Sequence, residues 1–246
     1  MLNKSQIFGP DYNNCPLVSF SLADSLITLR LPSNELKSPS ILAPSEIDTT
    51  APGIYTSGGA KGSLKFLFLV KQGWFYKLVG SPFNAGTLNF SLKLSEVSLD
   101  KETGDSLLSP AAFDQWLVNL FREDFAPLDK DKLEELALYE IEPSPEHMWV
   151  YPKSKSDFNS FELNHSLWRY AQAGHPSVKP HPFCLATPLS SKHALTLGFS
   201  FGGFSSPDGN MIDNYNDLLL SYIKDFLEHF HIQYSPETLA EMEQYK

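Results

Sequence analysis

The chain is poor in cysteine and has no long apolar run. Its two cysteines, Cys15 and Cys184, are too few for the disulfide framework of a small secreted protein. Its most apolar stretch, 64–70, is far too short to cross a bilayer, and the N-terminal residues lack the uninterrupted apolar core of a secretory signal. These absences predict a cytoplasmic protein without disulfides and without a membrane partner.

Clusters of lysine and arginine interleaved with aromatic residues are also absent. The 246 residues include 29 acidic and 19 basic side chains, which gives a formal net charge of −10. A surface of that sign repels phosphate groups, so neither nucleic acid nor anionic lipid is an expected partner. The length is sufficient for a substantial core in a single domain.

The negative charge is concentrated in two segments. Residues 96–146 contain 14 acidic and 4 basic residues, and residues 208–246 contain 8 and 2. One interpretation is that these are solvated helix faces, kept acidic for solubility. The other is that they attract a basic protein partner, because an excess of one charge steers association. The second interpretation predicts a binding surface that includes Asp129, Asp131, Glu134, Glu135, Glu140 and Glu142.

The first hundred residues favour antiparallel strands. Residues 16–32 contain two apolar-rich runs separated by Ala23-Asp24, as in a hairpin. Residues 64–80 suggest two strands that turn at Gln72-Gly73, and residues 87–99 alternate between apolar and polar side chains. The segment 1–100 is therefore expected to be β-rich.

Residues 101–246 contain both helical and strand patterns. Helices are predicted near 110–123, which begins with Ser109-Pro110, and over 211–231, with a last short helix after Ser235. Residues 129–143 suggest a short helix followed by a strand, and further strands are expected at 147–152, 161–172 and 193–201. Because strands come first and helices later, we predict one α+β domain. It would contain a twisted antiparallel sheet, built from the N-terminal half and residues 147–202, flanked by the helices at 110–123 and 211–231.

The segment 174–184, GHPSVKPHPFC, contains candidate zinc ligands in His175, His181 and Cys184. Only His181 and Cys184 have the close spacing of a ligand pair, and no second pair accompanies them. Its three prolines instead favour an extended connector, since each fixes φ and removes an amide donor. No metal and no cofactor is therefore expected.

Two patterns could indicate a nucleophile. Cys184 and His193 could approach each other if their strands form a hairpin. Ser200 lies in Gly198-Phe-Ser-Phe-Gly202, the spacing of a nucleophile elbow. However, that motif requires a sharp turn from strand to helix, and here the strand pattern continues through Ser200 into a turn-rich segment. We interpret Cys184 as a small buried residue and Ser200 as part of a strand.

Together these patterns favour protein recognition over catalysis. The expected function is an acidic cytoplasmic protein-binding module, of the kind that inhibits or gives immunity to a toxin or enzyme. The alternative is a hydrolase or metal-assisted enzyme that uses Cys184 with His193, or Ser200.

Overall fold

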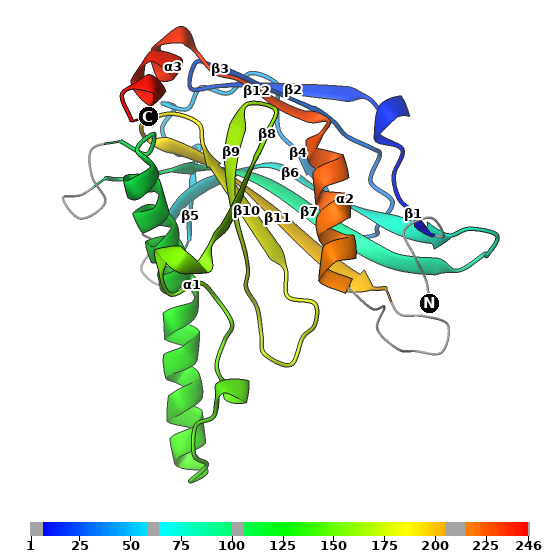
Figure 1. Cartoon of the computed structure of the whole chain (residues 1–246), viewed down its shortest axis with the longest axis vertical. Coiled ribbons are helices and arrows are strands. Elements are labelled where there is room, and N and C mark those ends of the chain that lie inside the picture. Colours follow the sequence, from blue (N-terminus) through cyan, green and yellow to red (C-terminus); the bar gives the residue numbers. More distant parts are fainter. Residues whose placement is uncertain (1–6, 59–63, 100–105, 205–214, 246) are drawn as a thin grey trace.

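A computed structural model describes residues 7–58, 64–99, 106–204 and 215–245. Within these residues the chain forms a curled antiparallel sheet, a separate three-stranded sheet and three α-helices (Figure 1). The prediction of an antiparallel sheet combined with helices is confirmed at this level. None of the described helices is both long and apolar enough to cross a membrane.

The large sheet contains nine strands of the described chain, all in antiparallel pairs. They are β1 (Ile7–Phe8), β4 (Ile41–Leu42), β5 (Thr56–Gly58), β6 (Leu64–Leu78), β7 (Asn84–Glu96), β8 (Asn159–Leu163), β9 (Ser166–Gln172), β10 (Phe183–Pro188) and β11 (His193–Gly203). The main order is β1-β6-β7-β11-β10-β9-β8, with β4 and β5 also paired to β6.

The predicted strands at 87–99 and 193–201 are confirmed by β7 and β11, which pair from His193 with Glu96 to Gly203 with Gly86. Their large apolar side chains lie on one side, which we call the inner face. Small and polar side chains such as Ser91, Lys93 and Thr196 lie on the other side, the outer face. The buried residues of the inner face are Leu88, Phe90, Leu92 and Leu94 of β7 and Leu195, Leu197, Phe199 and Phe201 of β11.

The predicted turn at Gln72-Gly73 is wrong, because β6 runs without interruption from Leu64 to Leu78. Gly73 is needed there for close packing instead: a Cβ at this position would collide with the side chain of Leu36 and the carbonyl oxygen of Leu88. The loop before β4 also binds this point of the strand, since the Gly73 amide donates to Asn34 Oδ1 at 2.8 Å.

The three-stranded sheet has the order β12-β3-β2. Its strands are β2 (Leu17–Leu22), β3 (Ser25–Arg30) and β12 (Phe230–Gln233). The predicted hairpin at Ala23-Asp24 is confirmed, and both residues have positive φ, as a tight turn between twisted strands requires. Residues 17–30 therefore belong to the smaller sheet, together with β12. This is contrary to the prediction that the N-terminal half contributes to a single sheet.

The predicted helix over 211–231 is shorter than expected. Residues 211–214 lie outside the described residues, and α2 (Tyr215–Leu227) ends before Phe230. Phe230 and Ile232 then alternate with exposed residues in β12, which pairs with β3. The Asn164 side chain marks the end of the helix by donating to the Leu227 carbonyl at 2.8 Å.

Helix α2 contributes to the main hydrophobic core, which lies on the inner face. The Phe226 ring lies 4.7 Å from the Phe90 ring and 5.6 Å from the Phe199 ring, centroid to centroid. The buried side chains of α2 are Tyr215, Leu219, Tyr222, Ile223, Phe226 and Leu227.

Helix α1 (Pro110–Leu138) begins after Ser109, as predicted, but continues well beyond residue 123. The expected helix-to-strand change within 129–143 is therefore wrong. Pro127 removes one amide donor inside the helix, but the helix continues through it. The first half of α1 packs with outer-face residues, and Arg169 of β9 binds Asp114 through Nε at 2.7 Å and Nη2 at 3.1 Å.

Two other predicted strands have different outcomes. Residues 161–172 form the hairpin of β8 and β9, with Asn164 and His165 at the turn. Residues 147–152 form no strand, and only Val150 makes an isolated bridge, to Gly174. The remaining short elements are the 3-10 turns η2 (Tyr12–Asn14), η3 (Pro145–His147) and η4 (Lys155–Asp157), and helix α3 (Pro236–Glu243).

Candidate functional site

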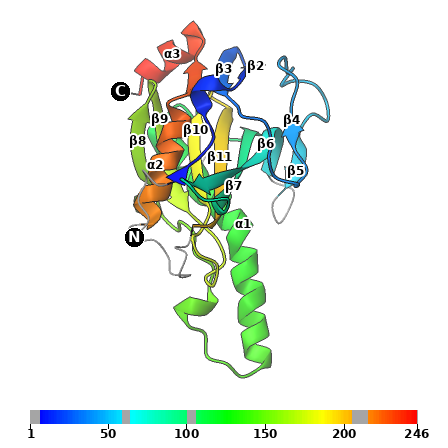
Figure 2. The same cartoon turned by 90° about the vertical axis from the view of Figure 1, so that its right-hand side faces the viewer.

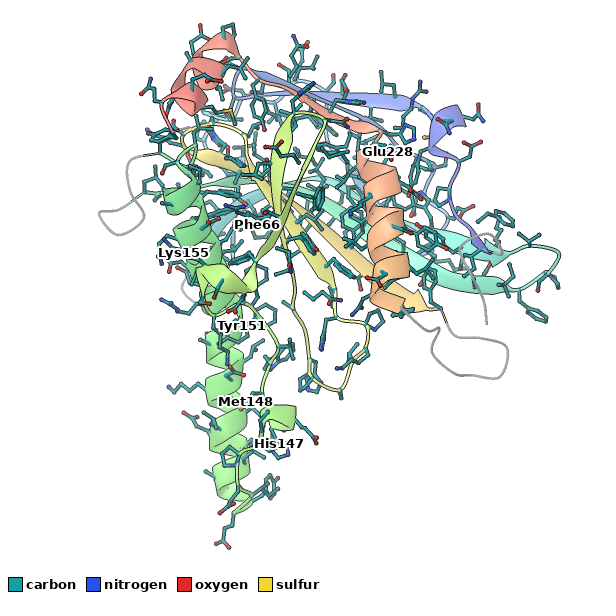
Figure 3. The ribbon with its side chains drawn as sticks, in the orientation of Figure 1. Phe66, His147, Met148, Tyr151, Lys155 and Glu228 are labelled. Carbon is teal, nitrogen blue, oxygen red and sulfur yellow. The ribbon has the colours of Figure 1, made fainter. Side chains whose placement is uncertain are left out.

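The distal half of α1 extends away from both sheets (Figures 1 and 2). We call residues 126–148 the arm, which comprises this half and the segment that returns beside it. Figure 3 shows His147 and Met148 next to the distal helix. The arm contains the C-terminal part of the acidic segment predicted from sequence, residues 126–146.

A buried carboxylate attaches the returning chain to the helix. Asp129 is buried, and its oxygens accept hydrogen bonds from the Trp149 amide at 2.8 Å and the Tyr151 hydroxyl at 3.2 Å. The Phe125 ring stacks on the Tyr151 ring at 5.2 Å. Burial and the neighbouring Asp129 charge both raise the pKa of Tyr151, so its hydroxyl stays a donor. Asp129 therefore supports the arm and does not face a partner.

The far end of the arm reverses the chain sharply. The Ile141 amide donates to the Leu136 carbonyl at 3.0 Å and the Glu140 amide to the Ala137 carbonyl at 3.3 Å, the pair of bonds of a Schellman motif. Glu140 has a φ of 54°, where glycine is usual. An exposed acidic residue thus occupies a position that local structure alone would give to glycine.

Three large apolar side chains are exposed at this reversal. Leu138 is 82% exposed, Tyr139 70% and Ile141 48%. We call these three residues the tip. Isolated exposed apolar side chains are common, but a sequence-adjacent group at the end of a projection is typical of a contact surface.

Acidic side chains surround the tip. Glu134 and Glu135 lie one turn before it and form ion pairs within the helix, with Lys130 at 3.6 Å and Lys132 at 2.8 Å. Asp131, Glu140 and Glu142 are exposed, and within the described part of the chain they form no ion pair. Of the six acidic residues predicted to form a binding surface, five are exposed on the arm and Asp129 is buried.

The structure keeps the candidate nucleophile Cys184 apart from His193. In the β10–β11 pairing Cys184 lies opposite Gly198. His193 lies one residue beyond the last pair of this ladder, which is Pro188 with Ala194. The two residues are therefore separated by about 16 Å along the sheet, at about 3.3 Å per residue. Burial also raises the pKa of Cys184 to about 11, so its thiol is protonated at neutral pH.

His193 has local partners of its own. Its Nδ1 lies 3.0 Å from the Ser190 hydroxyl and its ring stacks on Tyr55 at 6.4 Å. Burial lowers the pKa of His193, while Glu96 acts in the opposite direction. Ser200 is exposed on β11 opposite Asn89, and the strand passes straight through it without a nucleophile elbow. Within the described residues, neither Cys184 with His193 nor Ser200 has the geometry of a catalytic nucleophile and its base.

The candidate zinc ligands also remain separate. His175 is exposed, with its Nδ1 2.7 Å from the Ser177 hydroxyl and its ring against Trp149. His181 is buried, and burial lowers its pKa. Among the described residues no group of three histidine, cysteine or acidic side chains could hold a metal ion. The prediction of an extended connector is wrong for part of the segment. The Val178 amide donates to the His175 carbonyl at 3.0 Å, and this hydrogen bond forms a turn.

No protein-family model, curated protein or solved structure matches this chain.

Sequence reasoning found the acidic residues but missed the tip. The predicted change from helix to strand within 129–143 does not indicate that Leu138 and Ile141 lie at the exposed end of one long helix. The signal that could have identified them is the apolar cluster between four glutamates in EELALYEIE, which matches neither a strand nor a helical stripe.

Proposed function

We propose that this protein recognises a basic protein partner through its arm, with the tip at the centre of the contact. The observation that carries the proposal is the exposure of Leu138, Tyr139 and Ile141 at the end of a helix that projects from the sheets. Protein interfaces commonly have an apolar and aromatic centre with a polar rim. Tyrosine is also enriched among the residues that contribute most to binding energy.

The charge around the tip specifies the chemistry of the partner. The rim residues Asp131, Glu140 and Glu142 are negative and exposed, so a partner would need lysine or arginine around an apolar depression. Complementary charge of this kind accelerates encounter and excludes acidic partners.

An inhibitor or immunity-type role in the cytoplasm is consistent with this surface. A projecting arm can cover the cationic active site or nucleic-acid-binding surface of a toxin or enzyme without rearrangement of the sheets. The catalytic alternative has no comparable support, because Cys184, His193 and Ser200 lie apart within the described structure.

A photo-crosslinking amino acid at position 139 tests the proposal directly. After capture from native lysate and identification, the partner is mixed with purified protein and its association rate is measured by stopped flow. We expect simultaneous Glu134→Lys, Glu135→Lys and Glu140→Lys substitutions to slow association at least tenfold at low salt, and less at high salt.

The matched control reverses three exposed acids away from the arm, Glu46, Glu162 and Glu228. This control changes the net charge by the same amount and should leave most of the rate intact. An association rate that is unchanged by reversal on the arm, or equally reduced by the control, would contradict the proposal.

A further inference from the structure

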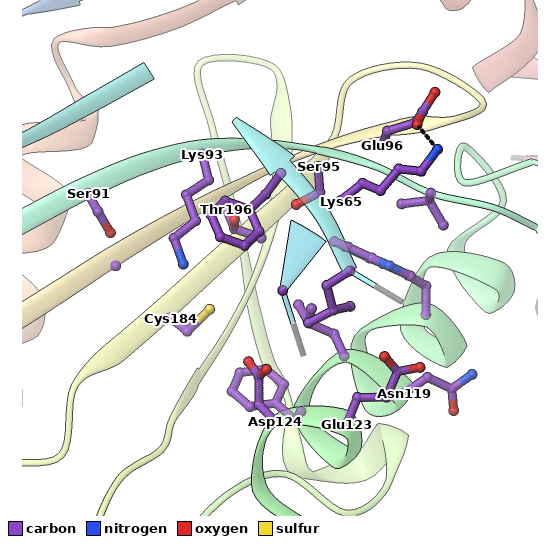
Figure 4. A pocket seen from close by; sticks show the side chains of 18 of the residues that line it. Lys65, Ser91, Lys93, Ser95, Glu96, Asn119, Glu123, Asp124, Cys184 and Thr196 are labelled. Atoms are coloured by element: carbon purple, nitrogen blue, oxygen red, sulfur yellow. Dashed lines mark hydrogen bonds and ion pairs between the residues drawn. The ribbon is translucent and has the colours of Figure 1, made fainter. Parts of the chain in front are cut away.

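A pocket lies between part of the first half of α1 and the outer face of the large sheet (Figure 4). It has a volume of about 560 Å³, within the range of small-molecule sites. Its floor includes Ser91, Lys93 and Thr196, and the helix contributes Trp116, Leu120 and Asp124. This pocket is distinct from the arm and is not used in the proposed function.

Lys93 provides the positive charge inside the pocket. Its ammonium group lies 5.0 Å from the centre of the Phe66 ring and 5.1 Å from that of Phe68. Among the described residues it forms no ion pair, whereas Lys65, also lining the pocket, is bound to Glu96 at 2.7 Å. The aromatic rings position the ammonium group and leave its hydrogen-bonding capacity unused.

Asp124 provides a negative charge on the opposite wall. Figure 4 shows Lys93 extending from β7 towards the helix and Asp124 extending from α1 towards the sheet, with Cys184 between them. Partial desolvation raises the pKa of Asp124, and the field of Lys93 lowers it, so the two groups interact across the gap. They do not form an ion pair with each other.

Two facing charges that do not touch are incompletely compensated. Lys93 is half-buried and Asp124 is exposed at the pocket wall, and among the described residues neither has a direct partner of opposite charge, which is less favourable than a hydrogen-bonded pair. Thr196 is the register partner of Lys93 in the β7–β11 pairing and also lines the pocket, so a hydroxyl donor is present on the same floor. The pocket therefore offers donors for an anionic group at the floor and an acceptor for a cationic group at the wall.

We propose that this pocket binds a small zwitterion of the amino-acid class. The carboxylate of the ligand pairs with Lys93 and the Thr196 hydroxyl, and its ammonium group pairs with Asp124. Its side chain packs against Trp116 and Leu120 of α1. A simple anion would leave Asp124 unpaired beside a second negative charge, and a simple cation would do the same to Lys93. A volume of about 560 Å³ favours a large apolar side chain over glycine.

Isothermal titration calorimetry with the whole chain tests this site. The probes are L-phenylalanine, L-tryptophan and L-leucine, each compared with its analogue that lacks the ammonium group and its analogue that lacks the carboxylate. At least one amino acid should bind, and both of its analogues should bind at least tenfold more weakly.

Substitutions assign the two charges. Lys93→Met and Asp124→Asn should each weaken binding of that amino acid at least tenfold. Lys71→Met and Asp24→Asn, which change exposed residues outside the pocket, should not. Thermal unfolding of each variant shows that a lost signal does not reflect an unfolded protein.

Three results would overturn the assignment. One is the absence of binding by all three amino acids to the folded wild-type chain. The second is equal affinity for the analogue without an ammonium group, which would indicate an anion site. The third is unchanged affinity in folded Lys93→Met protein.

Discussion

Helices α1 and α2 are used differently, although each packs on part of the large sheet. Helix α2 is 13 residues long, and apolar side chains from its first turn to its last are buried in the main core. Helix α1 is 29 residues long. Seven of its eight buried side chains lie at or before Asp129, and only Leu136 lies beyond it. Helix α2 therefore stabilises the fold, whereas α1 both stabilises the fold and presents a surface.

This difference follows from the position of the apolar side chains. A helix contributes to a core only where its apolar stripe faces other apolar groups. The stripe of α2 is continuous, whereas that of α1 gives way to alternating acidic and basic residues after Phe125. Ion pairs one turn apart, such as Lys132 with Glu135, support the exposed half locally.

The largest expected effect is at the centre of α2. Phe226→Ala should lower the free energy of unfolding by about 3–5 kcal/mol, because it leaves a cavity among Phe90 and Phe199. Denaturant titration measures the change. Phe83→Ala, at a side chain that is 74% exposed, is the control and should have little effect. Similar losses in the two variants would show that α2 does not pack in the main core.

The support of the arm should have a smaller effect. Asp129→Ala leaves the Trp149 amide and the Tyr151 hydroxyl without their acceptor, which costs about 1–3 kcal/mol in unfolding free energy. Hydrogen exchange of the Trp149 amide should accelerate at the same time. Asp131→Ala, two residues further along the same helix and exposed, should change neither measurement. Equal effects at both positions would mean that the return chain is not attached through Asp129.

Alkaline pH tests whether the first half of α1 covers the sheet. Cys184 lies beneath that half, and burial raises its pKa to about 11 from the ordinary 9.0. Between those values the unfolded chain loses the thiol proton and the folded chain keeps it, so rising pH favours unfolding. The wild type should therefore lose about 1.3 kcal/mol more than Cys184→Ala between pH 8 and pH 10. Urea titrations at both pH values measure this difference, and tyrosine ionisation affects both proteins alike. Equal losses would indicate that solvent reaches the thiol.

The smallest expected effect is at the tip. Leu138→Ser with Tyr139→Ser should change the unfolding free energy by less than about 0.5 kcal/mol, since both side chains are exposed. Leu136→Ser, on the same turn but buried, should cost about 2–5 kcal/mol. Chemical denaturation compares the two variants. A large loss in the double variant would place the tip within a packed cluster and remove its availability to a partner.

Several elements of the fold could be predicted because their signals are local. Strict alternation identified β7 and β11, the break at Ala23-Asp24 identified the β2–β3 hairpin, and Ser109-Pro110 identified the start of α1. Similarly, the strand pattern through Ser200 identified the continuation of β11 to Gly203. In each case the signal is a pattern of neighbouring residues, which identifies the element but not its partner strands.

Other elements depended on distant partners. Gly73 suggested a turn, but the loop at Asn34 occupies the space that its missing side chain leaves in β6. Phe230 and Ile232 extended a helical pattern, but pairing with β3 makes them a strand. The sheet that contains 17–30 could not be separated from the large sheet by periodicity, which reports alternation and not which strands pair.

The sequence by itself determined the alternating strands, the first turn of α1 and the concentration of acidic residues around positions 129–142, because composition and periodicity are properties of neighbouring residues. Only the tertiary structure decided that α1 projects past the sheets, that Leu138, Tyr139 and Ile141 are exposed at its end, and that Lys93 faces Asp124. These depend on strand pairing and helix packing between residues far apart in the chain, for which a single sequence has no local signal.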